Sequence, residues 1–186
     1  MKFAMLITLL LLTACQPVAI EPNVGLTLIP IASSTPGIIG ERQHLEGYFS
    51  FITPENYFAE LDDDSVFISD RTDEIFISLA IIGTGEDERT AQSLIDEIFG
   101  KFDGHEILNP SNTEVGGLAG RKVDFSGVLS NSVVSGNYVI IDLGDGVSFL
   151  AFGMGNVEEE KNTWDDYGRL NFTQLLATVE ILFDTY

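Results

Sequence analysis

The side chains of this 186-residue chain that are best placed to do chemistry are its carboxylates, many of which occur in short runs. The densest run is Asp62, Asp63 and Asp64, and a hard cation such as Ca²⁺ prefers several oxygen ligands of this kind. The twelve-residue calcium loop is absent, however, and adjacent acids in a strand or helix point in different directions. Two interpretations therefore stay open for this run: a cation site or a solvated turn. The other acidic groups are Asp142 with Asp145, residues 158–160, and Asp165 with Asp166.

Few other residues suggest catalysis. The two histidines, His44 and His105, are isolated in sequence, so neither forms a His-x-x-x-His metal pair, and we expect both to be solvated at the surface. No Gly-x-Ser-x-Gly motif is present. Gly83, Thr84 and Gly85 precede a helical pattern, but no P-loop lysine follows, and the acids that do follow would repel a phosphate. We expect a protein that is not an enzyme and uses no cofactor.

Cys15 is the single cysteine, and it closes an apolar N-terminal segment. Lys2 gives this segment a basic start, and the ten residues 3–12 form a run of low polarity. A helix that spans a bilayer needs about 20 such residues. The pattern is therefore typical of a cleaved signal peptide. One exported thiol cannot form an internal disulfide, so Cys15 needs another role.

Leu12, Thr13, Ala14 and Cys15 resemble the lipobox of bacterial lipoproteins. In that family the cysteine sulfur carries a diacylglycerol, the chain is cut before the cysteine, and the new amine is usually acylated, for example with palmitate. Two or more acyl chains hold a protein stably at a membrane, whereas one holds it marginally. The resemblance implies a signal peptide over residues 1–14 and a lipid anchor on the periplasmic or cell-surface side. An ordinary secretory signal that contains a cysteine is the alternative.

The charge of the chain restricts its partners. Removal of the signal peptide removes Lys2, which leaves eight basic residues against 29 acidic ones and a formal charge of −21. Nucleic acid is excluded as a partner, because its phosphates would be repelled. The charge also gives no attraction to anionic lipid, so the lipid on Cys15 must provide the membrane attachment. A cationic partner or simple solubility would each explain the charge.

Residues 15–43 are predicted to form a tether. Four of the six prolines fall here, and they interrupt both helix and strand patterns. The apolar stretches 24–31 and 38–39 leave open that the tether docks on the domain. Residues 44–186 then form one globular domain of common size, long enough to bury a core.

The first half of this domain predicts strands followed by a helix. Strands are expected at residues 48–52, 66–68 and 75–82, on the basis of β-branched and aromatic residues between turn signals. Apolar residues from Ala91 to Phe102 recur at helical spacing, so a helix packed on one side is expected there. Residues 86–88 are acidic and would lie at its positive end.

The second half predicts a loop, a hairpin and a last helix. Residues 109–120, with one proline and several glycines, are expected to form a loop that could contact a partner, and a strand follows at 121–128. Residues 138–143 and 147–154 should pair across an Asp-Gly turn, and both strands are apolar on both faces. Gly153 and Gly155 are taken to end the second strand. A last helix is expected near Thr163, with Asp166 completing a capping box.

These elements predict an α+β fold: a three-layer α/β/α sandwich with a mainly antiparallel sheet. The stretches GYFSFITPENY (47–57), GGLAGRKVDFSG (116–127) and FTQLLATVEIL (172–182) resemble the PsbP/Mog1-like α/β/α sandwich family. Tyr57 stands where an aromatic Trp is common in that family. The resemblance implies a binding or accessory protein that docks on a larger assembly.

The sequence as a whole therefore predicts a lipid-anchored, extracytoplasmic binding or accessory protein with an unidentified protein partner. The alternative is a cation-binding or cation-dependent protein, which could be an enzyme, that uses the acidic run at Asp62, Asp63 and Asp64.

Overall fold

The computed structural model of the protein describes residues 40–84 and 89–182. The chain divides into two units, Met1–Ser34 and Thr35–Tyr186, and every described residue belongs to the second. The predicted signal peptide, Cys15, most of the predicted tether and the acidic residues 86–88 therefore lie outside the described part of the chain.

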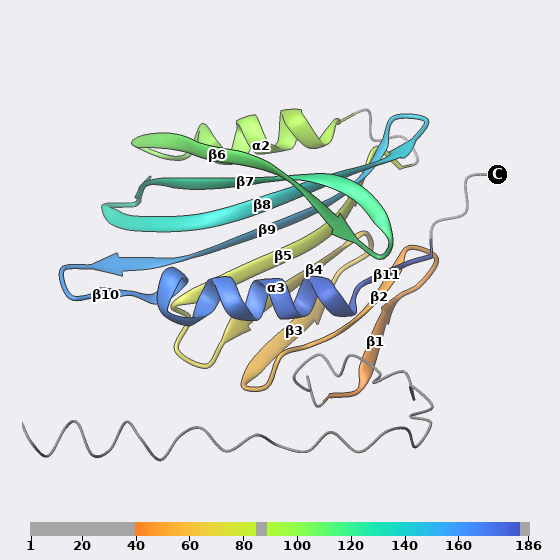
Figure 1. Cartoon of the computed structure of the whole chain (residues 1–186), viewed down its shortest axis with the longest axis horizontal. Coiled ribbons are helices and arrows are strands. Elements are labelled where there is room, and N and C mark those ends of the chain that lie inside the picture. The colour runs from red at the N-terminus through yellow and green to blue at the C-terminus, as the bar shows by residue number, and fades with distance from the viewer. Residues whose placement is uncertain (1–39, 85–88, 183–186) are drawn as a thin grey trace, which may run out of the picture. The chain divides into compact units, whose positions relative to one another are not determined.

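An eight-stranded antiparallel sheet dominates the domain (Figure 1). Its strands are β3 Tyr57–Leu61, β4 Ser65–Asp70, β5 Ile75–Ile82, β6 Gly104–Val115, β7 Leu118–Leu129, β8 Ser132–Gly144, β9 Val147–Glu158 and β10 Lys161–Asn162. The order across the sheet is β3-β4-β5-β9-β8-β7-β6, and β10 pairs with the end of β9. The predicted strands at 66–68, 75–82 and 121–128 are all present, whereas β3 was not anticipated.

A second, three-stranded sheet joins the two ends of the domain. It consists of β1 Arg42–Leu45, β2 Phe49–Ile52 and β11 Glu180–Ile181, in the order β1-β2-β11. The Nη1 atom of Arg42 donates a hydrogen bond to the carbonyl oxygen of Thr178 at 2.9 Å. Arg42 and Gln43 were assigned to the tether, but the folded part of the chain already includes them.

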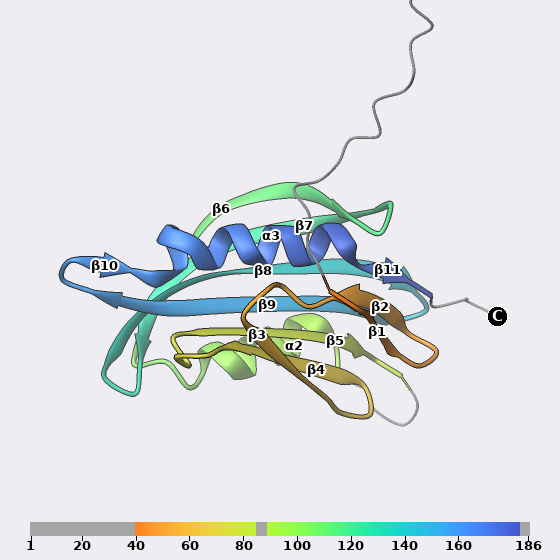
Figure 2. The same ribbon diagram turned by 90° about the horizontal axis from the view of Figure 1, so that it is seen from below.

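One helical segment packs on each face of the large sheet (Figure 2). The helix α2 spans Ala91–Phe99, and on the opposite face the π-helical turn η1 (Trp164–Gly168) continues into α3 (Arg169–Thr178). The prediction of a three-layer α/β/α sandwich is therefore confirmed only in part. The sheet is the dominant layer, because a single short helical segment covers only part of each face.

Two hydrophobic clusters hold these layers together. On the α3 face, Trp164 and Phe172 pack with sheet residues such as Phe149. On the α2 face, Ile95 and Phe99 pack with a different set of residues from β5, β7, β8 and β9. Adjacent residues on β8 and β9 belong to opposite clusters, which confirms that both strands are covered on two sides.

The two long hairpins differ in how well the sequence predicts them. Between β8 and β9, Asp145 and Gly146 have φ angles of 50° and 81°, and they form the expected two-residue turn. Residues 109–120, predicted to be a loop, lie instead in the β6–β7 hairpin. Its turn is Gly116-Gly117, with φ angles of 59° and 80°. The prediction was wrong because Pro110 is tolerated on an edge strand, at a register shift between Leu108 and Ser111.

Both helical segments begin where the sequence predicts, at Ala91 and next to Thr163, but their capping interactions were not foreseen. The N-cap of α2 is Thr90, which forms a capping box with Ser93: Ser93 N–H donates to Thr90 Oγ1 at 3.1 Å, and Thr90 N–H donates to Ser93 Oγ at 3.0 Å. The capping box expected at Thr163 and Asp166 is absent. The Thr163 hydroxyl donates instead to the carbonyl oxygen of Asn156 at 2.6 Å, which ties the helical segment to β9.

Gly153 and Gly155 lie inside β9 and do not end it. A Cβ atom on Gly153 would lie 2.5 Å from the Trp164 ring, and one on Gly155 would lie 3.0 Å from the Trp164 backbone nitrogen. These two glycines allow η1 to pack directly on the sheet.

Candidate functional site

The described domain has an apolar groove between α2 and the strands β4, β5 and β9. Its volume is about 450 Å³, which falls in the usual range of roughly 300–1,000 Å³ for small-molecule sites. We define the apolar groove by its lining residues: Asp64, Ser65, Phe67, Phe76, Ser78, Ala80, Ile82, Arg89, Leu94, Ile98, Lys101, Phe102, Leu129, Leu150, Phe152 and Met154.

The strand register explains the floor of the groove. Phe76, Ser78 and Ala80 alternate along β5 and pair with Met154, Phe152 and Leu150 of β9, so all six side chains lie on the α2 face. The residues between them, such as Ile77 and Leu79, belong to the core under α3.

The helix α2 supplies the wall of the groove. Its buried residues Ile95 and Phe99 belong to the cluster on β5, β7, β8 and β9, and Phe99 contacts aromatic rings of β7, β8 and β9. Leu94 and Ile98, one position earlier on the helix, line the groove instead. The groove exists because one nine-residue helix is too narrow to cover the α2 face as far as β4.

The charged residues of the groove are Asp64, Arg89 and Lys101. Lys101 Nζ lies 3.6 Å from a Glu97 carboxylate oxygen, and both side chains are more than half exposed. An exposed pair of this kind contributes at most about 1 kcal/mol, so the ammonium group can turn towards a bound group.

Exposed aromatic side chains extend the apolar surface beyond the groove. Phe58 of β3 is 58% exposed and Phe67 of β4 is 42% exposed. Phe58 pairs with Ser69, two residues from Phe67, so the two rings lie on the same face as diagonal neighbours. Phe67 in turn contacts Phe76, with ring centroids 5.9 Å apart. We call Phe58 and Phe67 the aromatic rim.

The predicted cation ligands do not come together into a site. Asp62, Asp63 and Asp64 form the turn between β3 and β4, where the Asp62 side chain accepts a hydrogen bond from the Asp63 N–H at 2.9 Å. Within residues 40–84 and 89–182, no three His, Cys, Asp or Glu side chains are close enough to hold a metal ion. Only Asp64 contributes to the groove.

The two histidines lie in different sheets. His44 is an exposed residue of β1. His105, also exposed, begins β6 and stacks on Phe99 with ring centroids 4.6 Å apart. Both histidines are at the surface, as expected.

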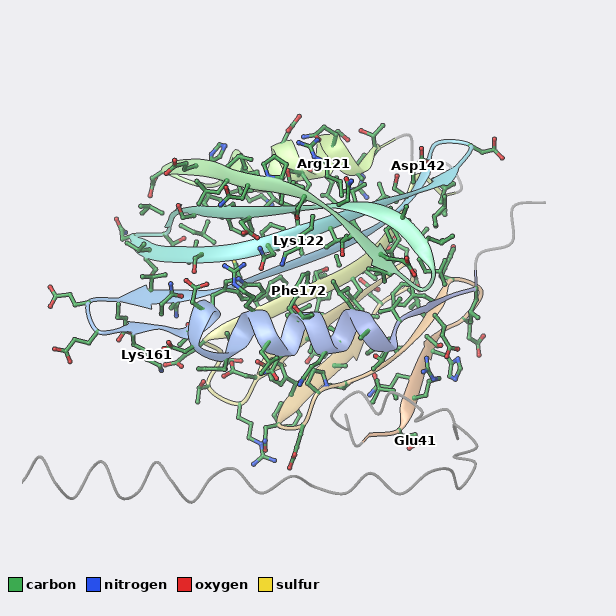
Figure 3. The ribbon with its side chains drawn as sticks, viewed as in Figure 1. Glu41, Arg121, Lys122, Asp142, Lys161 and Phe172 are labelled. Atoms are coloured by element: carbon green, nitrogen blue, oxygen red, sulfur yellow. The ribbon has the colours of Figure 1, made fainter. Side chains whose placement is uncertain are left out.

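A polar cluster that the sequence did not suggest links the β4–β5 turn to η1, which lies on the face of the sheet opposite the groove. Lys161 Nζ and the Tyr167 hydroxyl both donate to Glu74 Oε2, at 2.6 and 3.0 Å (Figure 3 labels Lys161). These two hydrogen bonds hold the pKa of Glu74 below its usual value. Burial and the bond to Glu74 raise the pKa of Tyr167 to about 12. A phenol that stays protonated beside a carboxylate that stays ionised forms a structural hydrogen bond, and such a pair is poorly suited to proton transfer.

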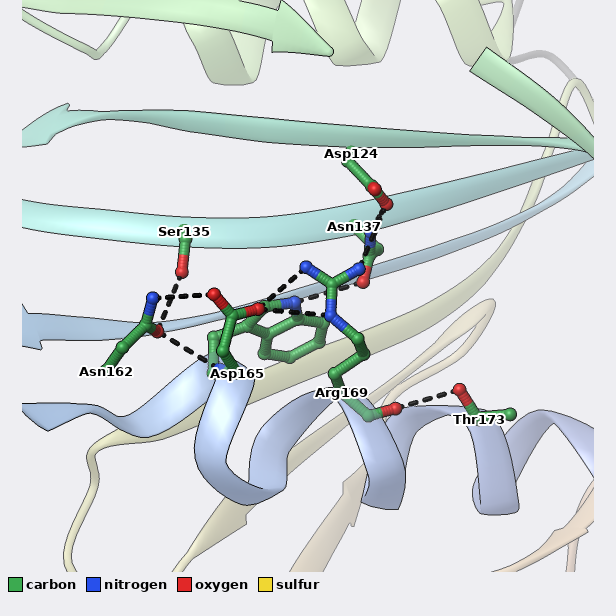
Figure 4. A network of polar contacts seen from close by, with 8 residues as sticks. Asp124, Ser135, Asn137, Asn162, Asp165, Arg169 and Thr173 are labelled. Atoms are coloured by element: carbon green, nitrogen blue, oxygen red, sulfur yellow. Dashed lines mark hydrogen bonds and ion pairs between the residues drawn. The ribbon is translucent and has the colours of Figure 1, made fainter. Parts of the chain in front are cut away.

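A second polar network fastens η1 and α3 to β7 and β8 (Figure 4). Asn137 is fully buried; its amide accepts from Trp164 Nε1–H at 3.0 Å and donates to Asp124. Arg169 donates to Asp124 at 3.3 Å and to Asp165 at 2.8 Å. Since the buried polar atoms of Asn137 and Trp164 already have partners within the protein, we assign this network to stability.

Within the described residues, no helix is long and apolar enough to cross a membrane. The sequence did not reveal the apolar groove, because its lining residues come from four strands and a helix.

Comparison with known proteins finds solved structures with a similar fold. No protein-family model and no curated protein matches the chain. The solution structure of the cyanobacterial PsbP from Synechocystis sp. PCC 6803 covers 82% of this chain and 99% of its own, with 15% identity and a TM-score of 0.50. The crystal structure of the Ran-binding protein Mog1p of Saccharomyces cerevisiae covers 79% of this chain and 97% of its own, with 8% identity and a TM-score of 0.55. These likenesses show a PsbP/Mog1-like fold.

Proposed function

We propose that this chain is a binding or accessory protein, held at the extracytoplasmic face of a membrane by a lipid on Cys15, that docks on a larger protein assembly. The observation that carries the proposal is the open apolar groove with its aromatic rim, because contiguous exposed apolar surface of this kind marks an interaction site. The similar fold of Mog1p, named a Ran-binding protein, supports a binding role. The lipobox residues support the anchor.

The aromatic rim is the part of this surface that we assign to the protein partner. Phe58 is more than half exposed on β3, an edge strand of the large sheet, and the guanidinium of Arg71 lies 5.9 Å from the centre of its ring. Exposed aromatic residues with an adjacent arginine are enriched at protein interfaces.

Cross-linking in intact membranes, followed by affinity purification and mass spectrometry, tests this function. We expect one stoichiometric neighbour with the unaltered chain and its loss with Phe58→Glu, since a buried charge opposes docking. Leu170→Glu is the matched control, because Leu170 is 60% exposed on α3, on the opposite face. Equal capture by both variants, or no neighbour at all, would contradict the proposal.

A further inference from the structure

We infer that the apolar groove binds the hydrocarbon chain of a free long-chain fatty acid, with the carboxylate at the Lys101 end. This inference rests on the proposed binding function and names a ligand class for the groove. The aromatic rim, assigned above to a protein partner, lies on the same face and shares Phe67 with the groove, whereas Phe58 is not among the lining residues.

The length and width of the groove fit a single extended chain. Its floor follows β5 from Phe76 to Ile82, which is roughly 20 Å at about 3.3 Å per residue. Its wall follows α2 over its whole length, from Arg89 before the helix to Phe102 after it. A volume of about 450 Å³ spread along this length leaves room for one hydrocarbon chain and not for several side by side.

The chemistry of the groove changes along its length. Side chains such as Leu94, Ile98 and Phe152 make its middle apolar, and Ser65 and Ser78 add only two hydroxyl groups. Such a surface favours methylene groups over a polar ligand. Charges occur only towards the two ends.

The two ends differ in charge. Where β5 finishes and α2 begins, the lining includes one residue of each sign, Arg89 and Asp64, and the Asp64 carbonyl accepts from the Ile81 N–H at 3.0 Å. Among the described lining residues, Lys101 is the only charged one at the other end. The chain carries nine basic residues against 29 acidic ones, so most of its surface repels anions. A cation at the end of an apolar groove is therefore best matched by an amphiphile with an anionic head.

Displacement of a fluorescent fatty acid, cis-parinarate, tests this inference. The full chain carrying Cys15→Ala is used, so that no acyl chain attached to the protein competes. We expect saturable binding that oleate reverses. Oleyl alcohol and oleylamine should compete about threefold to fivefold less well, which is the size of an exposed ion pair.

Two variants locate the ligand. Ser78→Trp places an indole on the groove floor and should weaken oleate binding about tenfold or more, because it occupies the space of several methylenes. Lys101→Gln should weaken it about threefold to fivefold and remove the preference for oleate over oleyl alcohol. Lys122→Gln is the matched control: Lys122 lies near Phe172 of α3, away from the groove (Figure 3), and should leave binding unchanged. Thermal melting checks that each variant is folded.

Several outcomes would overturn the inference. These are no saturable oleate binding, binding that Ser78→Trp leaves intact in a folded protein, or equal competition by oleylamine. Stronger competition by phosphatidylglycerol vesicles than by oleate at equal acyl concentration would assign the groove to membrane lipid instead. Dimerisation that Ser78→Trp abolishes, without oleate binding, would assign it to a second copy of the chain.

The failure of this inference is distinguishable from that of the proposed function. Oleate binding is measured on the purified Cys15→Ala chain without a partner, whereas docking is measured in membranes by the effect of Phe58→Glu. A chain that captures a neighbour but does not bind oleate would support the proposed function and exclude a fatty acid as the ligand of the groove.

Discussion

Asp70 shows how a single carboxylate fixes the turn between β4 and β5. Its side chain accepts hydrogen bonds from the Thr72 hydroxyl at 2.6 Å and from the N–H groups of Glu74 and Ile75 at 2.9 and 3.0 Å. Asp73 in this turn has a φ of 55°. Burial raises the pKa of Asp70, but the hydrogen bonds outweigh it and hold the pKa below the usual 3.8.

Replacement of Asp70 should therefore change both stability and its pH dependence. Asp70→Ala leaves two N–H groups without acceptors and should lower the free energy of unfolding by about 1–3 kcal/mol. A lowered pKa means that the stabilisation is complete above pH 3.8 and is lost as the pH falls through the folded-state pKa. Urea melts between pH 2 and 7 measure both effects.

Asp70→Asn is the control that separates charge from hydrogen bonding. Its amide oxygen still accepts from the backbone, so the loss near neutral pH should be smaller than with alanine. Its acid sensitivity should also be reduced. An Asp70→Ala variant as stable as the unaltered chain would contradict this account of the turn.

At the scale of elements, the contact between η1 and the sheet depends on small residues inside strands. Trp164 is fully buried against Gly153 of β9, and its indole N–H reaches Asn137 of β8. A Cβ atom on Gly136 of β8 would lie 2.3 Å from the Gly153 carbonyl oxygen, so the two strands also meet closely here. The helical segment keeps its place because β9 has no side chain at Gly153, beneath the Trp164 ring, and because Asn137 of β8 bonds the indole.

Gly153→Ala tests this contact. The added methyl group would lie 2.5 Å from the buried Trp164 ring, and overpacking of this kind costs about 1–3 kcal/mol. Gly104→Ala is the matched control, since Gly104 is also a strand residue and nothing lies within 4 Å of its added Cβ atom. Equal midpoints of thermal unfolding for the two variants would contradict a close fit between η1 and β9.

At the scale of the whole molecule, the proposed lipid anchor and the folded domain would have separate roles. The lipid on Cys15 would keep the chain at a membrane, while the apolar groove and aromatic rim lie in the folded domain. The formal charge of −20 for the complete chain gives the protein no attraction of its own to an anionic surface.

Cys15→Ala should therefore release the protein from membranes or leave its signal peptide uncut. Membrane fractionation and the mass of the mature chain measure the two results. Asn156→Ala or another change within the domain should leave fractionation unaffected. Unchanged fractionation together with an unchanged mature mass for Cys15→Ala would exclude the lipid anchor.

Local signals predicted much of the fold. β-Branched and aromatic residues identified β5, helical periodicity identified α2, and the Asp145-Gly146 dipeptide identified the β8–β9 turn, because each depends on residues close together in the chain. Pro110 and Gly153 were wrongly predicted to interrupt strands. The effect of each depends on its position in the sheet: Pro110 lies on the edge strand β6, and Gly153 lies beneath Trp164.

The sequence by itself determined the composition, the charge, the lipobox pattern and the order of most elements. Only the tertiary structure decided where a site could be, since the apolar groove joins Phe67, Ser78, Lys101 and Phe152 from four separate elements and connections. Sequence patterns report which face of an element is apolar. They do not report that one helix is narrower than the sheet it covers, and it is that difference in width that leaves the groove open.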